Sequence, residues 1–216
     1  MTTRLQTHLF ALLIVIAAVA FKYCGGSIWR PLLAEEKGDR TVKSVVAECI
    51  AAGKGLSEEE LEKAVGLVLI GLKEEKQLEV WLTNQEGFHR KIRSYPFTAY
   101  SGALGPKLNE GDLQIPEGIY DVEYLNPQSS YHLSIKLNYP NSFDRARAAE
   151  SERTRLGGDI FIHGRAVTIG CIPIGDEAIE DLFAIVAQVG KSKVTTIIAP
   201  RDFREGLEAP EIELVE

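Results

Sequence analysis

The 216-residue sequence has few of the residues that build metal sites or disulfide frameworks: three cysteines, four histidines and one methionine. It has no C-x-x-C pair and no H-E-x-x-H motif, so the patterns typical of structural and protease-type zinc sites are absent. It also has no G-x-G-x-x-G fingerprint and no G-x-S-x-G elbow, which removes the usual signals of dinucleotide binding and of a serine hydrolase.

The net charge is small outside the C-terminus, because acidic and basic residues nearly balance there. The formal net charge is −7, and the last twelve residues hold five glutamates with no lysine or arginine. Five of the seven net charges therefore lie in residues 205–216. We interpret residues 204–216 as a solvated acidic tail. The nearly neutral remainder has no basic surface for a phosphate backbone, so we expect no nucleic-acid partner.

The N-terminus carries an export pattern. Thirteen residues without a polar side chain, Leu9–Phe21, follow Arg4. The run is short for a membrane-spanning helix, which needs about 17–25 residues, but suits the core of a signal peptide. Ala18 and Ala20 form an A-x-A cleavage site. Residues 1–30 are therefore predicted to be a signal peptide or an uncleaved membrane anchor, with a buried core helix as the less favoured alternative.

Residues 31–65 are interpreted as a tether with two short helices, over 41–52 and 57–66. The second begins with a capping box, in which Ser57 is followed three residues later by Glu60. On this division Cys24 and Cys49 lie outside the folded domain and Cys171 lies inside it. A disulfide between the first two is conceivable, and one thiol remains unpaired in either case.

Residues 66–203 are predicted to form one mainly-β domain with a few short helices. Tyr131–Tyr139 alternates apolar and polar residues, which places Tyr131 on the buried face and His132 on the polar face. Residues 140–158 are expected to be a long charged loop, and 176–189 a helix capped by Asp176. Strands are expected over 67–72, 78–82, 119–125, 131–139, 159–163 and 194–199, the first two as a hairpin.

A histidine and a cysteine eight residues apart are the strongest chemical signal. His163 ends a predicted strand, and Cys171 follows Gly170 on a glycine turn. An imidazole that takes the thiol proton lowers the cysteine pKa from about 8.5 and makes it a fast nucleophile. The backbone N–H groups of Gly170 and Cys171 are candidate oxyanion donors.

Spacing alone leaves other interpretations open. A lone histidine and a lone cysteine are more often a hydrogen-bonded polar residue and a small buried apolar one. A metal site from His163, Cys171 and His132 is a weaker alternative, because no fourth ligand is evident.

The segment resembles the catalytic motif of the L,D-transpeptidase family, the YkuD-type domain. The motif elements are Ile162-His163-Gly164 and Thr168-Ile169-Gly170-Cys171. Four further blocks are similar to the murein L,D-transpeptidase subgroup of Gram-negative bacteria: 101–107, 110–112, 114–118 and 137–141.

The resemblance implies a β-sandwich domain that acts on peptidoglycan stem peptides in the periplasm and touches the inner membrane only through its N-terminal segment. Cys171 would attack at the diaminopimelate L-centre, expel D-alanine, and pass the acyl group to an amine, giving a cross-link or an attached outer-membrane lipoprotein. His163 would be the base, the Gly164 carbonyl would orient it, and Thr168 would shape the turn. Neither a metal nor an organic cofactor is implied.

Two positions depart from the family pattern. Ile169 and Pro173 stand where many members have a histidine and an arginine. The arginine is the expected partner of a substrate carboxylate, so another group must bind it. Arg165, His132 and Lys107, together with Thr168, are the candidate substrate-binding residues.

Three alternatives to transpeptidation remain. A cysteine-dependent hydrolase would use water to release lipoprotein or D-alanine through the same thioester. A non-catalytic peptidoglycan-binding scaffold would keep the fold without the chemistry. A general thiol protease fits the Cys–His pair but not the surrounding blocks.

Overall fold

The computed structural model describes residues 40–204. The predicted export segment, Cys24 and nearly all of the acidic tail lie outside this range. No helix within the described range is long and apolar enough to cross a membrane. The mainly-β prediction is confirmed, because residues 40–204 form one eight-stranded sheet with four α-helices and one short 3-10 helix.

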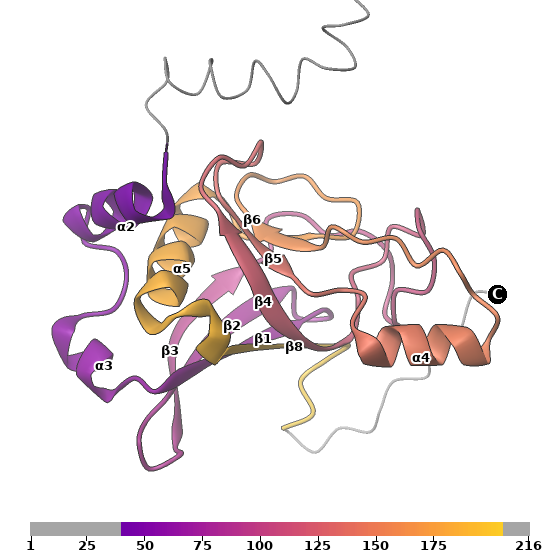
Figure 1. Ribbon diagram of the computed structural model, residues 1–216, viewed down its shortest axis with the longest axis horizontal. Coiled ribbons are helices and arrows are strands. Elements are labelled where there is room, and N and C mark those ends of the chain that lie inside the picture. Colours follow the sequence, from indigo (N-terminus) through magenta and orange to yellow (C-terminus); the bar gives the residue numbers. More distant parts are fainter. Residues whose placement is uncertain (1–39, 205–216) are drawn as a thin grey trace, which may run out of the picture. The chain divides into compact units, whose positions relative to one another are not determined.

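The strands follow the order β3-β2-β1-β8-β4-β5-β6-β7 across the sheet (Figure 1). The predicted hairpin is confirmed as an antiparallel β1–β2 pair, and β8 runs parallel to β1. The edge strand β3 was not predicted, since its basic residues hide any alternation. The bounds are β1 Gly66–Leu72, β2 Gln77–Thr83, β3 His89–Pro96, β4 Gly118–Asn126, β5 Ser134–Leu137, β6 Phe161–His163, β7 Ile172–Pro173 and β8 Val194–Ala199.

Strand β4 belongs to both halves of the sheet and makes it curl. Its first residues, 118–121, pair with β8, and its later residues pair with β5. The register shifts between Val122 and Tyr124. A bulge of this kind bends a strand and increases its twist, so the half of the sheet with β6 and β7 turns back toward β1 and β2.

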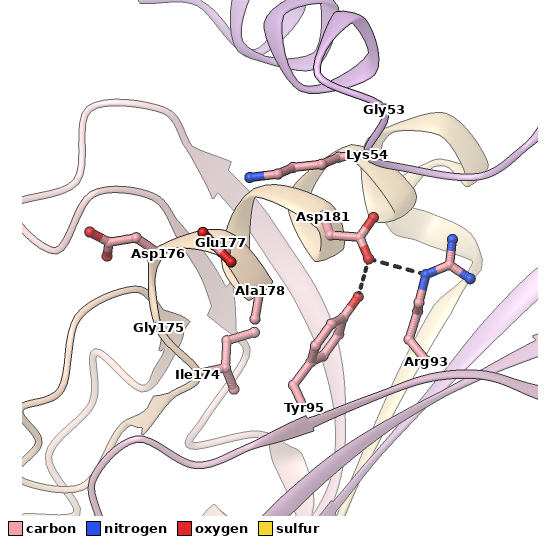
Figure 2. Close-up of a pocket in the computed structure, with 10 residues that line it drawn as sticks. All are labelled: Gly53, Lys54, Arg93, Tyr95, Ile174, Gly175, Asp176, Glu177, Ala178 and Asp181. Carbon is pink, nitrogen blue, oxygen red and sulfur yellow. Dashed lines mark hydrogen bonds and ion pairs between the residues drawn. The ribbon is translucent and has the colours of Figure 1, made fainter.

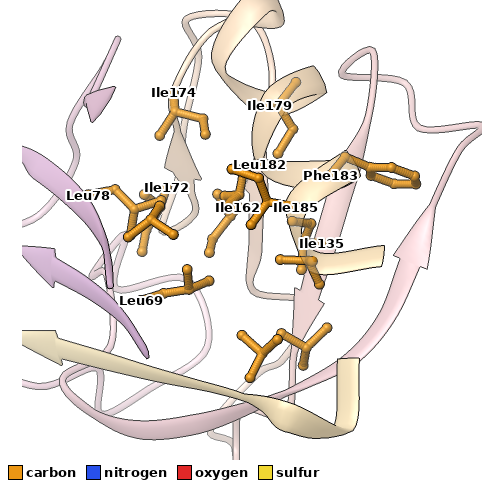
Figure 3. Packing of buried hydrophobic residues seen from close by; sticks show 14 of the residues in the cluster. Leu69, Leu78, Ile135, Ile162, Ile172, Ile174, Ile179, Leu182, Phe183 and Ile185 are labelled. Carbon is orange, nitrogen blue, oxygen red and sulfur yellow. The ribbon is translucent and has the colours of Figure 1, made fainter. Parts of the chain in front are cut away.

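The core fills the space inside this curl. Figure 3 shows Leu69 of β1 and Leu78 of β2 near Ile172 of β7, with Leu182 of helix α5 (Asp176–Val189) above them. All four side chains are buried. The two halves of the curled sheet therefore pack like a sandwich around the apolar face of α5, in agreement with the predicted fold class.

Both helices of the predicted tether are present and belong to the folded unit. They are α2 (Val42–Ala51) and α3 (Glu58–Lys63), and Ser57 forms the expected capping box. Helix α2 packs against α5 and buries Val45 and Cys49 in the common core. The sequence analysis was therefore wrong to place Cys49 outside the folded domain.

The predicted strand 131–139 is shorter than expected. The strand observed there is β5, Ser134–Leu137. His132 has a φ of +73°, a left-handed conformation outside the extended range, so the strand begins after it. Tyr131 is 44% exposed instead of buried, and Ser134, on the predicted polar face, is buried.

The predicted loop 140–158 contains a helix, α4 (Ser142–Glu150). Asn141 and Asp144 cap its N-terminus reciprocally, each side chain accepting from the other's backbone N–H. Of its residues only Ala148 is buried, so the helix has no apolar stripe that the sequence pattern could show.

Helix α5 is confirmed over 176–189, but Asp176 does not cap it. The N-cap is Gly175, which has no side chain to supply a capping bond. The Asp176 carboxylate accepts instead from the backbone N–H of Arg165, at 2.7 Å.

Candidate active site

The parallel pair β6–β7 brings His163 and Cys171 to one edge of the sheet. Ile162 stands opposite Ile172, and His163 opposite Pro173. Cys171 directly precedes β7, so this register sets it opposite Phe161, two residues from His163. Residues two apart along a strand share a face, and so do paired residues. Cys171 lies one residue before the paired strand, so extending the β6–β7 register by that residue predicts that the histidine and the cysteine share a face.

The ring of His163 is held by the next residue of its own chain. Its Nδ1 lies 2.6 Å from the carbonyl oxygen of Gly164. A carbonyl oxygen only accepts, so Nδ1 carries the proton and Nε2 keeps a lone pair. Burial lowers the pKa of His163, and the Gly164 carbonyl opposes this shift. The neutral imidazole is therefore in the tautomer that a general base requires.

Gly164 sits where no other residue fits. A Cβ at this position would lie 2.5 Å from Asp176 Oδ1, 2.8 Å from the Tyr131 carbonyl oxygen and 3.1 Å from Ile179 Cγ2. The backbone of the His-Gly turn is thus pressed between α5 and the segment before β5. This close packing fixes the carbonyl that orients His163.

Thr168 organises the turn that carries the cysteine. Its hydroxyl donates to the Cys171 carbonyl at 2.7 Å. It accepts from the N–H of Cys171 at 2.8 Å and from the N–H of Gly170 at 3.1 Å. The two N–H groups that the sequence suggested as oxyanion donors are therefore bonded to Thr168 in this structure.

The thiol environment differs from the expected one. The Cys171 thiol donates to the Asp159 carbonyl at 3.5 Å. Burial raises the pKa of Cys171, the Phe161 N–H lowers it, the Asp159 carboxylate raises it, and Lys107 lowers it. The prediction of a lowered cysteine pKa was wrong. With a raised thiol pKa and a lowered histidine pKa, the pair rests in its neutral form.

Lys107 is the predicted substrate residue whose charge reaches Cys171. Its side chain is buried, and its Nζ donates to Asp112 Oδ1 at 2.6 Å and to the Asn109 carbonyl at 2.8 Å. The Asp112 carboxylate also accepts three backbone N–H bonds from the same loop. Lys107 is therefore built into a rigid loop beside the thiol.

Gln114 joins this loop to the cysteine turn, a role that sequence reasoning missed. Its side-chain oxygen accepts from the Ala103 N–H at 2.9 Å. Its main-chain carbonyl oxygen would lie 3.0 Å from a Cβ added at Gly170, whose φ is +127°. The family-like block 114–118 was the available signal, but nothing in the sequence assigned it a contact.

Lys73 lies in the turn between β1 and β2, yet its side chain is fully buried. Its Nζ donates to the carbonyls of Gly105 (2.6 Å) and Ile115 (3.0 Å) and to Glu117 Oε1 (2.8 Å). Burial lowers the pKa of Lys73, and Glu117 opposes the shift. Lys73 thus bonds both ends of the loop 105–117, which includes Lys107 and Gln114.

His132 and Arg165 do not join the His–Cys pair through any side-chain bond within the described range. His132 Nε2 bonds Glu180 Oε1 on α5 at 2.6 Å. Arg165 has a φ of +61°, its carbonyl accepts from Thr98 Oγ1 at 2.6 Å, and its side chain is exposed. Substrate binding by these two residues stays a prediction.

A shallow pocket of about 630 Å³ opens beside the start of α5 (Figure 2). It contains neither His163 nor Cys171. Its charges largely pair with each other, since Asp181 accepts from Tyr95 Oη at 2.6 Å and from Arg93 Nε at 3.1 Å. These bonds do not identify a ligand for the pocket. Within residues 40–204, no three His, Cys, Asp or Glu side chains are grouped to hold a metal ion.

The family model of the YkuD L,D-transpeptidase catalytic domain matches residues 67–198. The chain belongs to this family. The match spans the strands and loops that carry His163, Thr168 and Cys171, so the L,D-transpeptidase resemblance inferred from the sequence is confirmed.

Two relatives illustrate the likeness. YafK of Escherichia coli (strain K12), provisionally named an L,D-transpeptidase, is 37% identical over 116 residues, which cover 53% of this chain and 44% of YafK. The crystal structure of the helical cell shape determining protein Pgp2 from Campylobacter jejuni superimposes with a TM-score of 0.52 at 22% identity, over 76% of this chain and 56% of Pgp2. The chain thus spans about half the length of these relatives.

Proposed function

We propose that the protein is a peptidoglycan L,D-transpeptidase that acts through a thioester on Cys171. The observation that carries this proposal is the Nδ1–H bond from His163 to the Gly164 carbonyl, which leaves Nε2 with a lone pair. The register of β6 and β7, extended by one residue to Cys171, supports a thiol within reach of Nε2. Residues 1–30 would bring the domain to the periplasm as a signal peptide or an anchor.

The first half-reaction makes the thioester. His163 Nε2 takes the thiol proton as Cys171 Sγ attacks the carbonyl of the diaminopimelate L-centre. The tetrahedral intermediate collapses, its bond to the D-alanine nitrogen breaks, and His163 returns the proton to that nitrogen. D-alanine leaves, and the acyl group stays on sulfur.

The second half-reaction returns the free thiol. An acceptor amine attacks the thioester and gives a proton to His163, which passes it to the departing sulfur. The acceptor amine belongs either to a second stem peptide or to an outer-membrane lipoprotein. If water attacks instead, the same residues perform hydrolysis, and only exclusion of water separates the two outcomes.

Lys107 is the proposed contact for a stem-peptide carboxylate. It places a positive charge near Cys171, where Pro173 replaces the arginine common in the family. That charge is paired with Asp112 in this structure, so a stem-peptide carboxylate would have to share Lys107 with Asp112 or displace it. Thr168 would shape the turn that carries Cys171. Arg165 and His132 are further candidates for substrate binding.

The test uses the full chain in detergent with lipoprotein-bearing sacculi and mass spectrometry of the products. We expect new diaminopimelate–diaminopimelate links or newly attached lipoprotein, with release of D-alanine. Cys171→Ala should abolish these products, and Cys49→Ala, which removes a buried thiol elsewhere, should retain them. Freed lipoprotein without new links would indicate a hydrolase. Identical products from wild type and Cys171→Ala would favour the scaffold alternative.

A further inference from the structure

The helical segment 41–65 lies outside the family match at 67–198 but reaches the candidate active site through charged side chains. Lys54, in the link between α2 and α3, forms an ion pair with Glu180 on α5. Both side chains are about one quarter exposed, so the pair is partly shielded from water. The Glu180 carboxylate is therefore one point at which the segment 41–65 contacts helix α5.

Glu180 also contacts His132, in the turn before β5. Its second carboxylate oxygen, Oε1, accepts from His132 Nε2 at 2.6 Å. His132 holds a left-handed backbone conformation with a φ of +73°. Such a conformation costs energy in a non-glycine residue and persists where surrounding contacts fix it. The Glu180 carboxylate is a side-chain contact that can hold this residue in place.

The residues on either side of His132 touch the proposed base. The ring of Tyr131 lies against the ring of His163, with centroids 4.6 Å apart and planes tilted by 34°. The carbonyl of Leu133 accepts from the Gly164 N–H at 3.2 Å. The turn thus contacts both the imidazole and the glycine that orients it.

We propose that Lys54, Glu180 and His132 are positioning residues that hold Tyr131 against His163 and so set the direction of its Nε2. The proposal rests on the proposed function, in which His163 is the base. It makes the segment 41–65 a working part of the enzyme. The ring contact with Tyr131 restricts rotation of the imidazole, and the Glu180 carboxylate anchors the turn that carries Tyr131.

The test measures acylation of Cys171 by p-nitrophenyl acetate in the full chain, with the adduct located by mass spectrometry. At about pH 7 the thiol needs a base, whereas near pH 10 much more of it is ionised and the base matters less. A misoriented His163 therefore slows acylation at neutral pH and much less at high pH. A general loss of folded protein lowers both rates equally.

We expect Lys54→Met and His132→Ala each to lower the neutral-pH rate about tenfold, part of the larger factor that a well-placed base contributes. The rate near pH 10 should stay close to that of wild type. Combining Lys54→Met with Tyr131→Ala should give no more than the larger single effect, because the two changes break one chain of contacts.

Gln188→Ala is the matched control. Gln188 also lies on α5 and bonds the same segment, through the N–H and carbonyl of Leu56, without touching Glu180 or His132. It should leave the ratio of the two rates unchanged. The proposal is overturned if Lys54→Met keeps the wild-type ratio or if Gln188→Ala changes it equally. If His163→Gln matches wild type at both pH values, the proposed function itself fails.

Discussion

His163→Gln will lower kcat/KM for release of D-alanine from a stem peptide by roughly a hundred- to ten-thousand-fold, the usual contribution of a positioned general base. The amide retains much of the size of the imidazole but cannot take a proton. His89→Gln is the matched control, since His89 lies on the edge strand β3 and its ring bonds Thr83, away from His163 and Cys171. It should keep wild-type activity.

The same role for His163 predicts how kcat/KM changes with pH. Burial lowers the pKa of His163 and raises that of Cys171. Wild-type kcat/KM should therefore rise with pH through a histidine pKa below about 6.5. It should fall only above about 8.5, where the thiol proton needed by the leaving amine is lost. The plateau between is broad because the two shifts move the limbs apart.

The His163→Gln profile should lack the acidic limb, because no base remains to be protonated. Steady-state rates across the pH range at constant ionic strength measure both profiles. An acidic limb that survives in His163→Gln would assign it to another group and would contradict the role of this histidine.

Gly164→Ala will destabilise the fold by roughly 2 kcal/mol, a typical cost of forcing a methyl group into packed structure. The new Cβ would lie within 3 Å of both Asp176 Oδ1 and the Tyr131 carbonyl. Relief of these contacts must move the carbonyl that holds His163, so activity should fall even where the variant is fully folded.

Gly158→Ala is the control for this substitution. A Cβ there would meet nothing nearer than the Tyr139 carbonyl at 4.0 Å, and its φ is unstrained. Urea unfolding of both variants measures the free energy of unfolding. An equal loss in the two, or a Gly164→Ala variant with wild-type stability and activity, would show that the close packing has no consequence.

The sequence predicted the elements that have a strong apolar period. The hairpin β1–β2, the strands β4 and β8 and the helix α5 lie close to their expected positions because one face of each is buried. Helix α4 was missed because Ala148 is its only buried residue. The left-handed residue His132 delays the start of β5, which alternation alone would place at Tyr131.

The sequence predicted His163 and Cys171 as a candidate pair but not the contacts that surround them. Lys73, in a polar stretch, is buried by tertiary packing that no local pattern reveals. The Gly170 and Cys171 N–H groups bond Thr168, an alternative that spacing cannot distinguish from an oxyanion site. Burial also reversed the expected direction of the Cys171 pKa. Each of these features depends on residues brought together only by the fold.

The most direct test of a Cys171 thioester is rapid quenching of the full chain with a disaccharide tetrapeptide that ends in diaminopimelate–D-alanine. Intact-mass spectrometry should detect an adduct equal to the substrate without its D-alanine, located at Cys171 and removed by hydroxylamine. Cys171→Ala should form no adduct. Release of D-alanine at the wild-type rate with no adduct on Cys171, or by Cys171→Ala, would contradict catalysis through this cysteine.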